Sequence, residues 1–146
     1  MTFNFPFDAL KEYLQRHRSI SQPHISEKKH YQLLEITCSS IYLLCPEESK
    51  LEIFREIELI SDSNKILLGK LDLVALSDKD LYLFEVKTPR GYFIKKHRLN
   101  DGWRQLAIAH DYFLERYGVS GKRRLVYTSG GKRASKNRES KKEILF

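Results

Sequence analysis

The chain has 146 residues, of which 41% are hydrophobic and 31% are charged, and its formal net charge is +7. This length suits one domain with a real core, and the composition is typical of a soluble globular protein. No apolar run approaches the roughly 20 residues that span a bilayer, so we predict no membrane partner. The N-terminal residues lack the basic and apolar regions of a secretory signal, which predicts an intracellular, cytoplasmic location.

The two halves of the chain differ in charge. Residues 1–86 carry ten Lys or Arg and fourteen Asp or Glu, whereas residues 87–146 carry sixteen and five. A generally basic surface would explain the sign of the net charge but not this segregation. An asymmetric field of this kind suits a polyanion that lies across one side of the molecule.

The N-terminal part of the chain shows helical spacing. Phe7, Leu10 and Leu14 form one apolar stripe, which predicts a helix over residues 7–18. Ser26 is a good N-cap for a second helix that we expect to reach Cys45. Cys38 and Cys45 lie seven residues apart in this helix, about 10 Å, so we predict no disulfide between them.

The central and C-terminal parts alternate strand and helix patterns. We expect strands over residues 51–60, 66–76, 81–88 and 124–128, and a helix from Asn100 or Asp101 to about Tyr117. Residues 89–98 read as an irregular basic stretch. The order of two helices, three strands, a helix and a strand predicts an α/β fold with a four-stranded mixed sheet flanked by helices.

Two acidic residues fall opposite each other in the predicted hairpin. Its turn is Ser77-Asp-Lys-Asp80, and if Leu76 pairs with Leu81 the antiparallel register also pairs Asp72 with Glu85. Their Cβ atoms then lie about 5 Å apart. The two like charges repel, and a divalent cation between them removes the repulsion and can promote phosphoester chemistry.

An exposed ladder of ion pairs is the bland alternative for these acids. Val74, Leu81 and Leu83 make the same face of the hairpin largely apolar, which favours a cleft over open solvent. Lys87, two residues after Glu85, projects from that face and can stabilise charge that develops on a phosphate. The trio of Asp72, Glu85 and Lys87 therefore predicts a metal-dependent nuclease.

The segments Gly69-Lys-Leu-Asp72-Leu-Val and Glu85-Val-Lys87-Thr, with the order of elements around them, resemble the PD-(D/E)XK nuclease superfamily. This superfamily includes restriction enzymes, junction resolvases and repair exonucleases related to RecB. The resemblance covers about residues 26–128, and Leu71 stands where the family name has Pro. It implies a restriction-endonuclease-like core and one nuclease-like domain over residues 1–128, with an N-terminal helical extension.

The resemblance also implies roles for individual residues. Asp72 and Glu85 would coordinate Mg²⁺ or Mn²⁺ together with the backbone carbonyl of Val86. Lys87 would orient or help to deprotonate the attacking water.

The family also leads us to expect a third acidic ligand from the helix that precedes the sheet. Glu35 is the first candidate, Glu27 lies nearer the start of that helix, and Glu56 on the first strand is the other contender.

Gln105 falls on the helix after the third strand, where related nucleases carry a glutamine that reaches the active site. Those nucleases often follow it with a Tyr about one turn later, a place that Ala109 occupies here. The match is partial, and a polar residue at the edge of the helix is the alternative.

The segment after the hairpin mixes cations with aromatic residues. Tyr92, Phe93 and Trp103 are interpreted first as core residues, with base stacking as the alternative. The candidate phosphate contacts are Arg90, Lys95, Lys96, Arg98 and Arg104. Residues 129–146 read as a basic, mobile C-terminal tail that is either a DNA-binding arm or plain disorder.

We therefore expect a Mg²⁺- or Mn²⁺-dependent nuclease that hydrolyses DNA phosphodiester bonds with a metal-activated water; RNA is an open alternative as substrate. A catalytically inactive nucleic-acid-binding module is the second hypothesis, and an adaptor for an acidic protein is a distant third. Endonuclease and exonuclease action are equally open. Small nucleases of this type often form homodimers, and no residue of the sequence identifies an interface.

Overall fold

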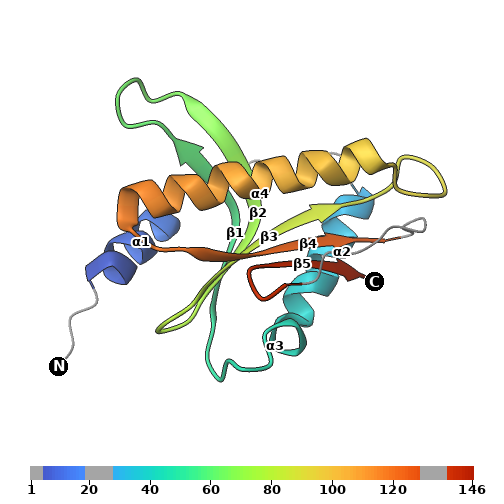
Figure 1. Cartoon of the computed structure of the whole chain (residues 1–146), viewed down its shortest axis with the longest axis horizontal. Helices are drawn as coiled ribbons and strands as arrows, with labels where there is room; N and C mark the ends of the chain where they lie inside the picture. Colours follow the sequence, from blue (N-terminus) through green and yellow to red (C-terminus); the bar gives the residue numbers. More distant parts are fainter. Residues whose placement is uncertain (1–4, 19–27, 129–137) are drawn as a thin grey trace.

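The computed structural model describes residues 5–18, 28–128 and 138–146, which form an α/β fold (Figure 1). Its N-terminal helices are α1 (Phe5–Arg16), α2 (Lys28–Ser39) and the short α3 (Ile41–Leu44). Three strands follow as β1 (Glu52–Ile60), β2 (Leu67–Leu76) and β3 (Leu81–Lys87). The long helix α4 (Lys96–Tyr117) then leads to β4 (Gly121–Tyr127) and β5 (Lys141–Leu145).

The strands form one mixed sheet in the order β1-β2-β3-β4-β5. β1, β2 and β3 pair antiparallel, whereas β4 is parallel to β3 and β5 is parallel to β4. Helix α4 makes the crossover between β3 and β4, as two neighbouring parallel strands require. The predicted mixed sheet flanked by helices is confirmed, but it has five strands where the sequence predicted four.

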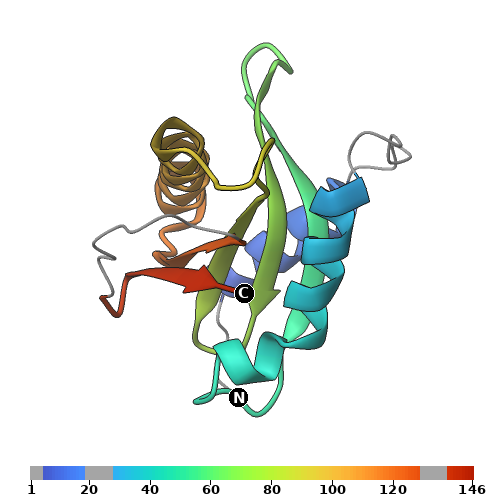
Figure 2. The same cartoon turned by 90° about the vertical axis from the view of Figure 1, so that its right-hand side faces the viewer.

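Helices cover both faces of this sheet (Figure 2). One face packs with α1 and α4 into a cluster that includes Leu10, Leu83 and Phe113, and the other packs with α2 and α3 into a cluster that includes Leu34 and Phe84. The central strand β3 is buried at every position except Lys87, which explains its nearly continuous apolar sequence. Among the described residues, no helix is long and apolar enough to cross a membrane.

Three predicted boundaries are wrong by four residues or more, and β4 begins at Gly121, three residues before its predicted start. The second helix ends at Ser39, and α3 follows it as a separate element. Helix α4 begins at Lys96, before the predicted Asn100 or Asp101. Its first turn carries bases instead of the acids that favour a helix N-terminus, so the sequence signal pointed to a later start.

The third boundary concerns the C-terminus. Lys141–Leu145 was assigned to the basic tail, but it forms β5 and extends the sheet beside β4. Residues 129–137 of the predicted tail and the predicted cap Ser26 lie outside the described residues.

Candidate active site

The predicted hairpin register is confirmed where β2 and β3 pair. Leu76 lies opposite Leu81, and the backbone ladder continues to Leu73 and Phe84, where it ends. Asp72 and Glu85 are the next two residues along. Because the strands stop exchanging backbone hydrogen bonds at this point, polar groups of both residues are free to bond to side chains.

The side chains of Asp72 and Glu85 each accept a hydrogen bond from the backbone of the other strand. The backbone N–H of Asp72 donates to Glu85 Oε1 at 3.2 Å, and the backbone N–H of Val86 donates to Asp72 Oδ2 at 2.8 Å. His30, near the start of α2, places Nε2 3.2 Å from Asp72 Oδ1. The side chain of Glu85 is 3% exposed and that of Asp72 is 15% exposed, so both carboxyl groups are largely withdrawn from water.

The surroundings shift the pKa values of the two acids in opposite directions. Burial, followed by the charge of Asp72, raises the pKa of Glu85 well above its usual value. Burial also acts to raise the pKa of Asp72, but hydrogen bonds with His30 and Glu85 outweigh it and lower that pKa overall. Without a cation the surroundings therefore favour the protonated form of Glu85 and the ionised form of Asp72.

Lys87 completes the predicted trio. Its Nζ lies 3.7 Å from Glu85 Oε2, and its side chain is 14% exposed. Helix α4 packs directly against this lysine, because a Cβ built on Gly102 would lie 3.3 Å from Lys87 Cγ. Glycine at this position lets the helix approach the end of β3 and hold Lys87 beside Glu85.

Gln105 lies one helical turn after Gly102. Its Oε1 is buried and has no hydrogen-bond partner among the described residues. Buried polar atoms are normally paired, so an unpaired one at this place is a sign of a functional constraint. The role of Gln105 in the site stays a prediction.

The candidates for the third acidic ligand lie in different surroundings. Glu35 is 63% exposed and forms an ion pair with Arg55 of β1, and not with the acids of the hairpin. Glu56 is 17% exposed, accepts a hydrogen bond from the Tyr31 hydroxyl at 2.7 Å and lies 4.0 Å from Lys70 Nζ. Glu27 lies outside the described residues.

Glu56 occupies an unusual place on β1. Arg55 pairs with Leu73 and Ile57 with Leu71, so the register sets Glu56 opposite Asp72, although no backbone pair forms there. Its φ is +51°, in the left-handed region that a non-glycine residue rarely adopts. Consecutive residues of α2, His30 and Tyr31, contact Asp72 and Glu56. Glu56 is thus the candidate that shares its surroundings with Asp72.

The predicted phosphate contacts fall into two groups. Arg90, Lys95 and Lys96 are exposed, and the last two begin α4 beside the end of β3. Arg98 instead donates from Nε to the Thr88 carbonyl at 2.5 Å, and Arg104 pairs with Asp101 at 2.6 Å. Arg98 therefore helps to hold the loop that follows Lys87, while the first group is available to an anion.

The interpretation of the nearby aromatics as core is wrong for two of them. Tyr92 is 93% exposed and Phe93 is 68% exposed, whereas Trp103 is partly buried and donates from Nε1 to Glu143 at 3.2 Å. His30 is a candidate site residue that the sequence interpretation missed, because its Nε2 lies 3.2 Å from Asp72 Oδ1. Its position in the same helix as Glu35, the favoured third acid, was the only signal that could have indicated this.

The donor set fits a hard divalent cation held by few protein ligands. Asp72 and Glu85 offer carboxylate oxygens from adjacent strands. The pKa of Glu85 is raised by burial and then by the charge of Asp72, and a cation between the two would favour the ionised form of both. Among residues 5–18, 28–128 and 138–146, no group of three or more His, Cys, Asp or Glu is arranged to hold a metal ion. Mg²⁺ commonly binds through one or two carboxylates and keeps several waters, so two acids suffice for it.

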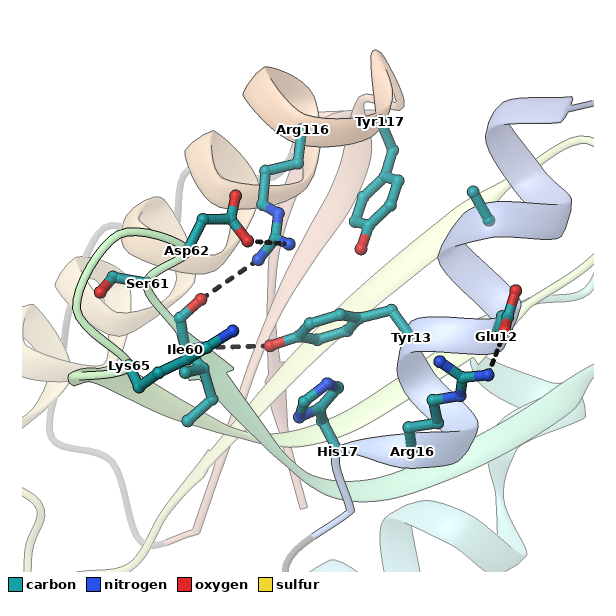
Figure 3. Close-up of a pocket in the computed structure, with 11 residues that line it drawn as sticks. Glu12, Tyr13, Arg16, His17, Ile60, Ser61, Asp62, Lys65, Arg116 and Tyr117 are labelled. Carbon is teal, nitrogen blue, oxygen red and sulfur yellow. Dashed lines mark hydrogen bonds and ion pairs between the residues drawn. The ribbon is translucent and has the colours of Figure 1, made fainter.

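A separate pocket of about 380 Å³ lies between α1, the β1–β2 turn and the end of α4 (Figure 3). The Arg116 guanidinium lies over the rings of Tyr13, Tyr112 and Tyr117, and it donates to the Ile60 carbonyl and to Asp62 at 3.1 and 2.6 Å. Arg116 of α4 thus connects the β1–β2 turn to both α1 and α4. None of the predicted site residues lines this pocket.

Comparisons with known proteins give no match: no family model fits the chain, and no curated protein or solved structure is detectably similar to it. The resemblance to PD-(D/E)XK nucleases therefore rests on the motif and the order of elements alone.

Proposed function

We propose that the protein is a metal-dependent nuclease that hydrolyses DNA phosphodiester bonds, built on a restriction-endonuclease-like core. The observation that carries the proposal is the joining of Asp72 and Glu85 where β2 and β3 stop pairing, with Lys87 Nζ 3.7 Å from Glu85. Three such groups, largely withdrawn from water, are costly for stability alone.

The proposed chemistry follows from these side chains. Asp72 and Glu85 would hold Mg²⁺ or Mn²⁺, with the Val86 carbonyl as a further ligand. A bound cation of this kind activates water and polarises a phosphate. The attacking water gives a proton to solvent and its oxygen forms a bond to phosphorus. The bond from phosphorus to one sugar oxygen then breaks, and that sugar oxygen takes up a proton. Lys87 donates to the phosphate oxygens, on which negative charge grows.

The surface beside the site suits a polyanionic substrate. Lys95 and Lys96 open α4, and its N-terminus carries the positive end of the helix dipole without a side-chain cap. Arg90 is exposed on the connecting loop. A DNA strand at Lys87 would meet these cations in its backbone phosphates, and contacts of this kind position a strand without reading its sequence.

The test compares Asp72→Asn with Asp78→Asn, which changes an exposed acid in the turn of the same hairpin. Both variants and the wild type are incubated with labelled single-stranded, duplex and branched DNA in Mg²⁺, Mn²⁺ or EDTA. We expect wild type and Asp78→Asn to cleave in metal alone, and Asp72→Asn to be inactive while it remains folded. Cleavage that survives Asp72→Asn or EDTA would rule the proposal out.

A nucleic-acid-binding module without catalytic activity is the second candidate. It is favoured by the exposed cations Arg90, Lys95 and Lys96, which could contact phosphates without any metal. Under this alternative no metal supports cleavage, and wild type and Asp72→Asn bind DNA equally. Binding should then weaken steeply with salt, because the contacted phosphates release counterions.

A further inference from the structure

The loop between β3 and α4 displays two neighbouring aromatic rings to solvent. Tyr92 is 93% exposed and Phe93 is 68% exposed. Aromatic side chains carry large apolar surfaces that normally pack in a core or an interface. Two of them side by side and uncovered indicate a surface that receives a partner.

The loop is anchored on both sides of these rings. Thr88 is 8% exposed before them, and Ile94 is 6% exposed after them. Arg98, from the first turn of α4, donates to the Thr88 carbonyl and fixes the start of the loop. The rings are thus held on the loop that leaves β3, five and six residues along the chain from Lys87.

The charges around the rings indicate what the partner is. Arg90, Lys95 and Lys96 are exposed on the same loop and at the helix start, and residues 86–100 contain no Asp or Glu. Exposed rings set among cations are how proteins bind single-stranded nucleic acid, because the rings stack on bases and the cations contact phosphates. A membrane or an acidic protein would not need flat rings beside the cleavage chemistry.

We propose that Tyr92 and Phe93 stack on unpaired bases next to the bond that is cut, so that the substrate is unpaired at this point. In a continuous duplex both faces of each base are covered by neighbouring base pairs, and a ring can stack only where a base is unpaired or a step is opened. The unpaired bases come from a free single strand or from the arm of a branched duplex. This inference rests on the proposed nuclease function, because it names the substrate of that site.

The test measures binding in EDTA, where no cleavage occurs. Wild type and a Tyr92→Ala/Phe93→Ala double variant are titrated with a labelled single strand, a blunt duplex, a branched duplex with a single-stranded arm, and a single strand of abasic sites, all of equal length. We expect the double variant to lose about tenfold in affinity per ring for the first and third ligands and less than about twofold for the blunt duplex. Wild type should bind the abasic strand as weakly as the double variant binds the normal strand.

Two control variants accompany the test. Leu43→Ala removes an 83% exposed apolar side chain from α3 and should leave all affinities unchanged. Tyr92→Phe combined with Phe93→Tyr keeps both rings and should restore the preference for unpaired bases. The proposal is supported if the wild type binds the single strand or the branched duplex more tightly than the blunt duplex. Whichever of these two ligands binds more tightly identifies the source of the unpaired bases.

An equal loss on every ligand, no loss on any, or full affinity for the abasic strand would overturn the inference. Failure of the nuclease function looks different. No cleavage in any metal, with ring-dependent binding in EDTA, rejects the nuclease and leaves base stacking in place. Cleavage that does not depend on the rings rejects base stacking and leaves the nuclease in place.

Discussion

Asp72 Oδ2 accepts a hydrogen bond from the backbone N–H of Val86 at 2.8 Å, at the point where β2 and β3 stop pairing. A carboxylate here replaces the carbonyl that would otherwise continue the ladder. Glu85 Oε1 in turn accepts the backbone N–H of Asp72 at 3.2 Å. The two acids therefore end the antiparallel pairing and satisfy the backbone that they leave open.

Glu85→Gln should abolish most of the cleavage activity while it leaves the stability of the protein nearly unchanged. Burial, followed by the charge of Asp72, raises the pKa of Glu85 well above its ordinary value, so an uncharged amide of the same shape should replace this acid at little cost. We expect the free energy of unfolding in EDTA to change by less than about 1 kcal/mol, and cleavage to fall at least about 100-fold. Urea unfolding and a single-turnover cleavage assay measure the two effects.

Asp72→Asn is the contrasting variant. It removes an ionised carboxylate that interacts with His30, Val86 and Glu85, so we expect a loss of about 1–3 kcal/mol in EDTA. If Glu85→Gln were the more destabilising of the two, the assignment of the proton to Glu85 would be wrong.

The stability of the metal-free protein should fall as the pH rises. Glu85 has a folded-state pKa well above its ordinary value of 4.5, so the folded protein keeps a proton that the unfolded chain has released. The free energy of unfolding then decreases from about pH 4.5 upward through the raised pKa. The lowered pKa of Asp72 acts only in more acidic solution, where stability is lost as the pH falls below its ordinary value of 3.8.

Urea midpoints measured in EDTA over this range, for wild type and Glu85→Gln, isolate the contribution of Glu85. The difference in stability between the two should move in favour of the variant as the pH rises. Added Mg²⁺ should reduce the loss in wild type alone, because the cation favours the ionised pair. Parallel pH profiles for the two proteins would contradict the raised pKa.

The sequence predicted the trio because its signals are local. Strand alternation and a four-residue turn set the register, and the register places Asp72 beside Glu85. The third acid could not be predicted in this way, because it depends on where α2 and β1 cross the hairpin. Glu35 and Glu56 both carry a carboxylate in a suitable element, and only the packing shows that Glu56 lies opposite Asp72 while Glu35 turns to Arg55.

The missed strand and the exposed rings have other physical causes. β5 has five residues, and Ile144 is its one side chain packed against a core cluster, so its pairing with β4 is visible only in the fold. Tyr92 and Phe93 are apolar by composition, and composition predicts burial. Their exposure follows from the loop, whose buried residues are Thr88 and Ile94.

Substitutions of Glu56 should test both its backbone and its carboxylate. Because its φ is +51°, Glu56→Gly should be more stable than Glu56→Ala by about 1 kcal/mol in thermal or urea unfolding. Glu56→Gln keeps an acceptor for Tyr31 and should still lower cleavage about tenfold or more if the carboxylate serves the site. Glu35→Gln is the matched variant, and we expect it to retain activity. Retained activity in Glu56→Gln with loss in Glu35→Gln would reverse the choice between them.

Gly102→Ala should disturb Lys87 through packing alone. The added Cβ would lie 2.5 Å from Leu125 Cδ1 and 3.3 Å from Lys87 Cγ, so both side chains must shift. Overpacking costs about 1–3 kcal/mol, and the better helix propensity of alanine offsets about 1 kcal/mol of it. We therefore expect a small loss of stability, and a fall in cleavage about tenfold or greater because Lys87 is displaced from Glu85.

Gly91→Ala is the control for this variant, because nothing lies within 4 Å of a Cβ added there. It should leave both unfolding and cleavage unchanged. The affinity for Mn²⁺, measured by titration calorimetry, should be nearly the same in Gly102→Ala as in the wild type, because Asp72 and Glu85 keep their positions. A variant that lost metal binding and cleavage together would indicate that the helix holds the two acids, whereas loss of cleavage alone indicates that it holds the lysine.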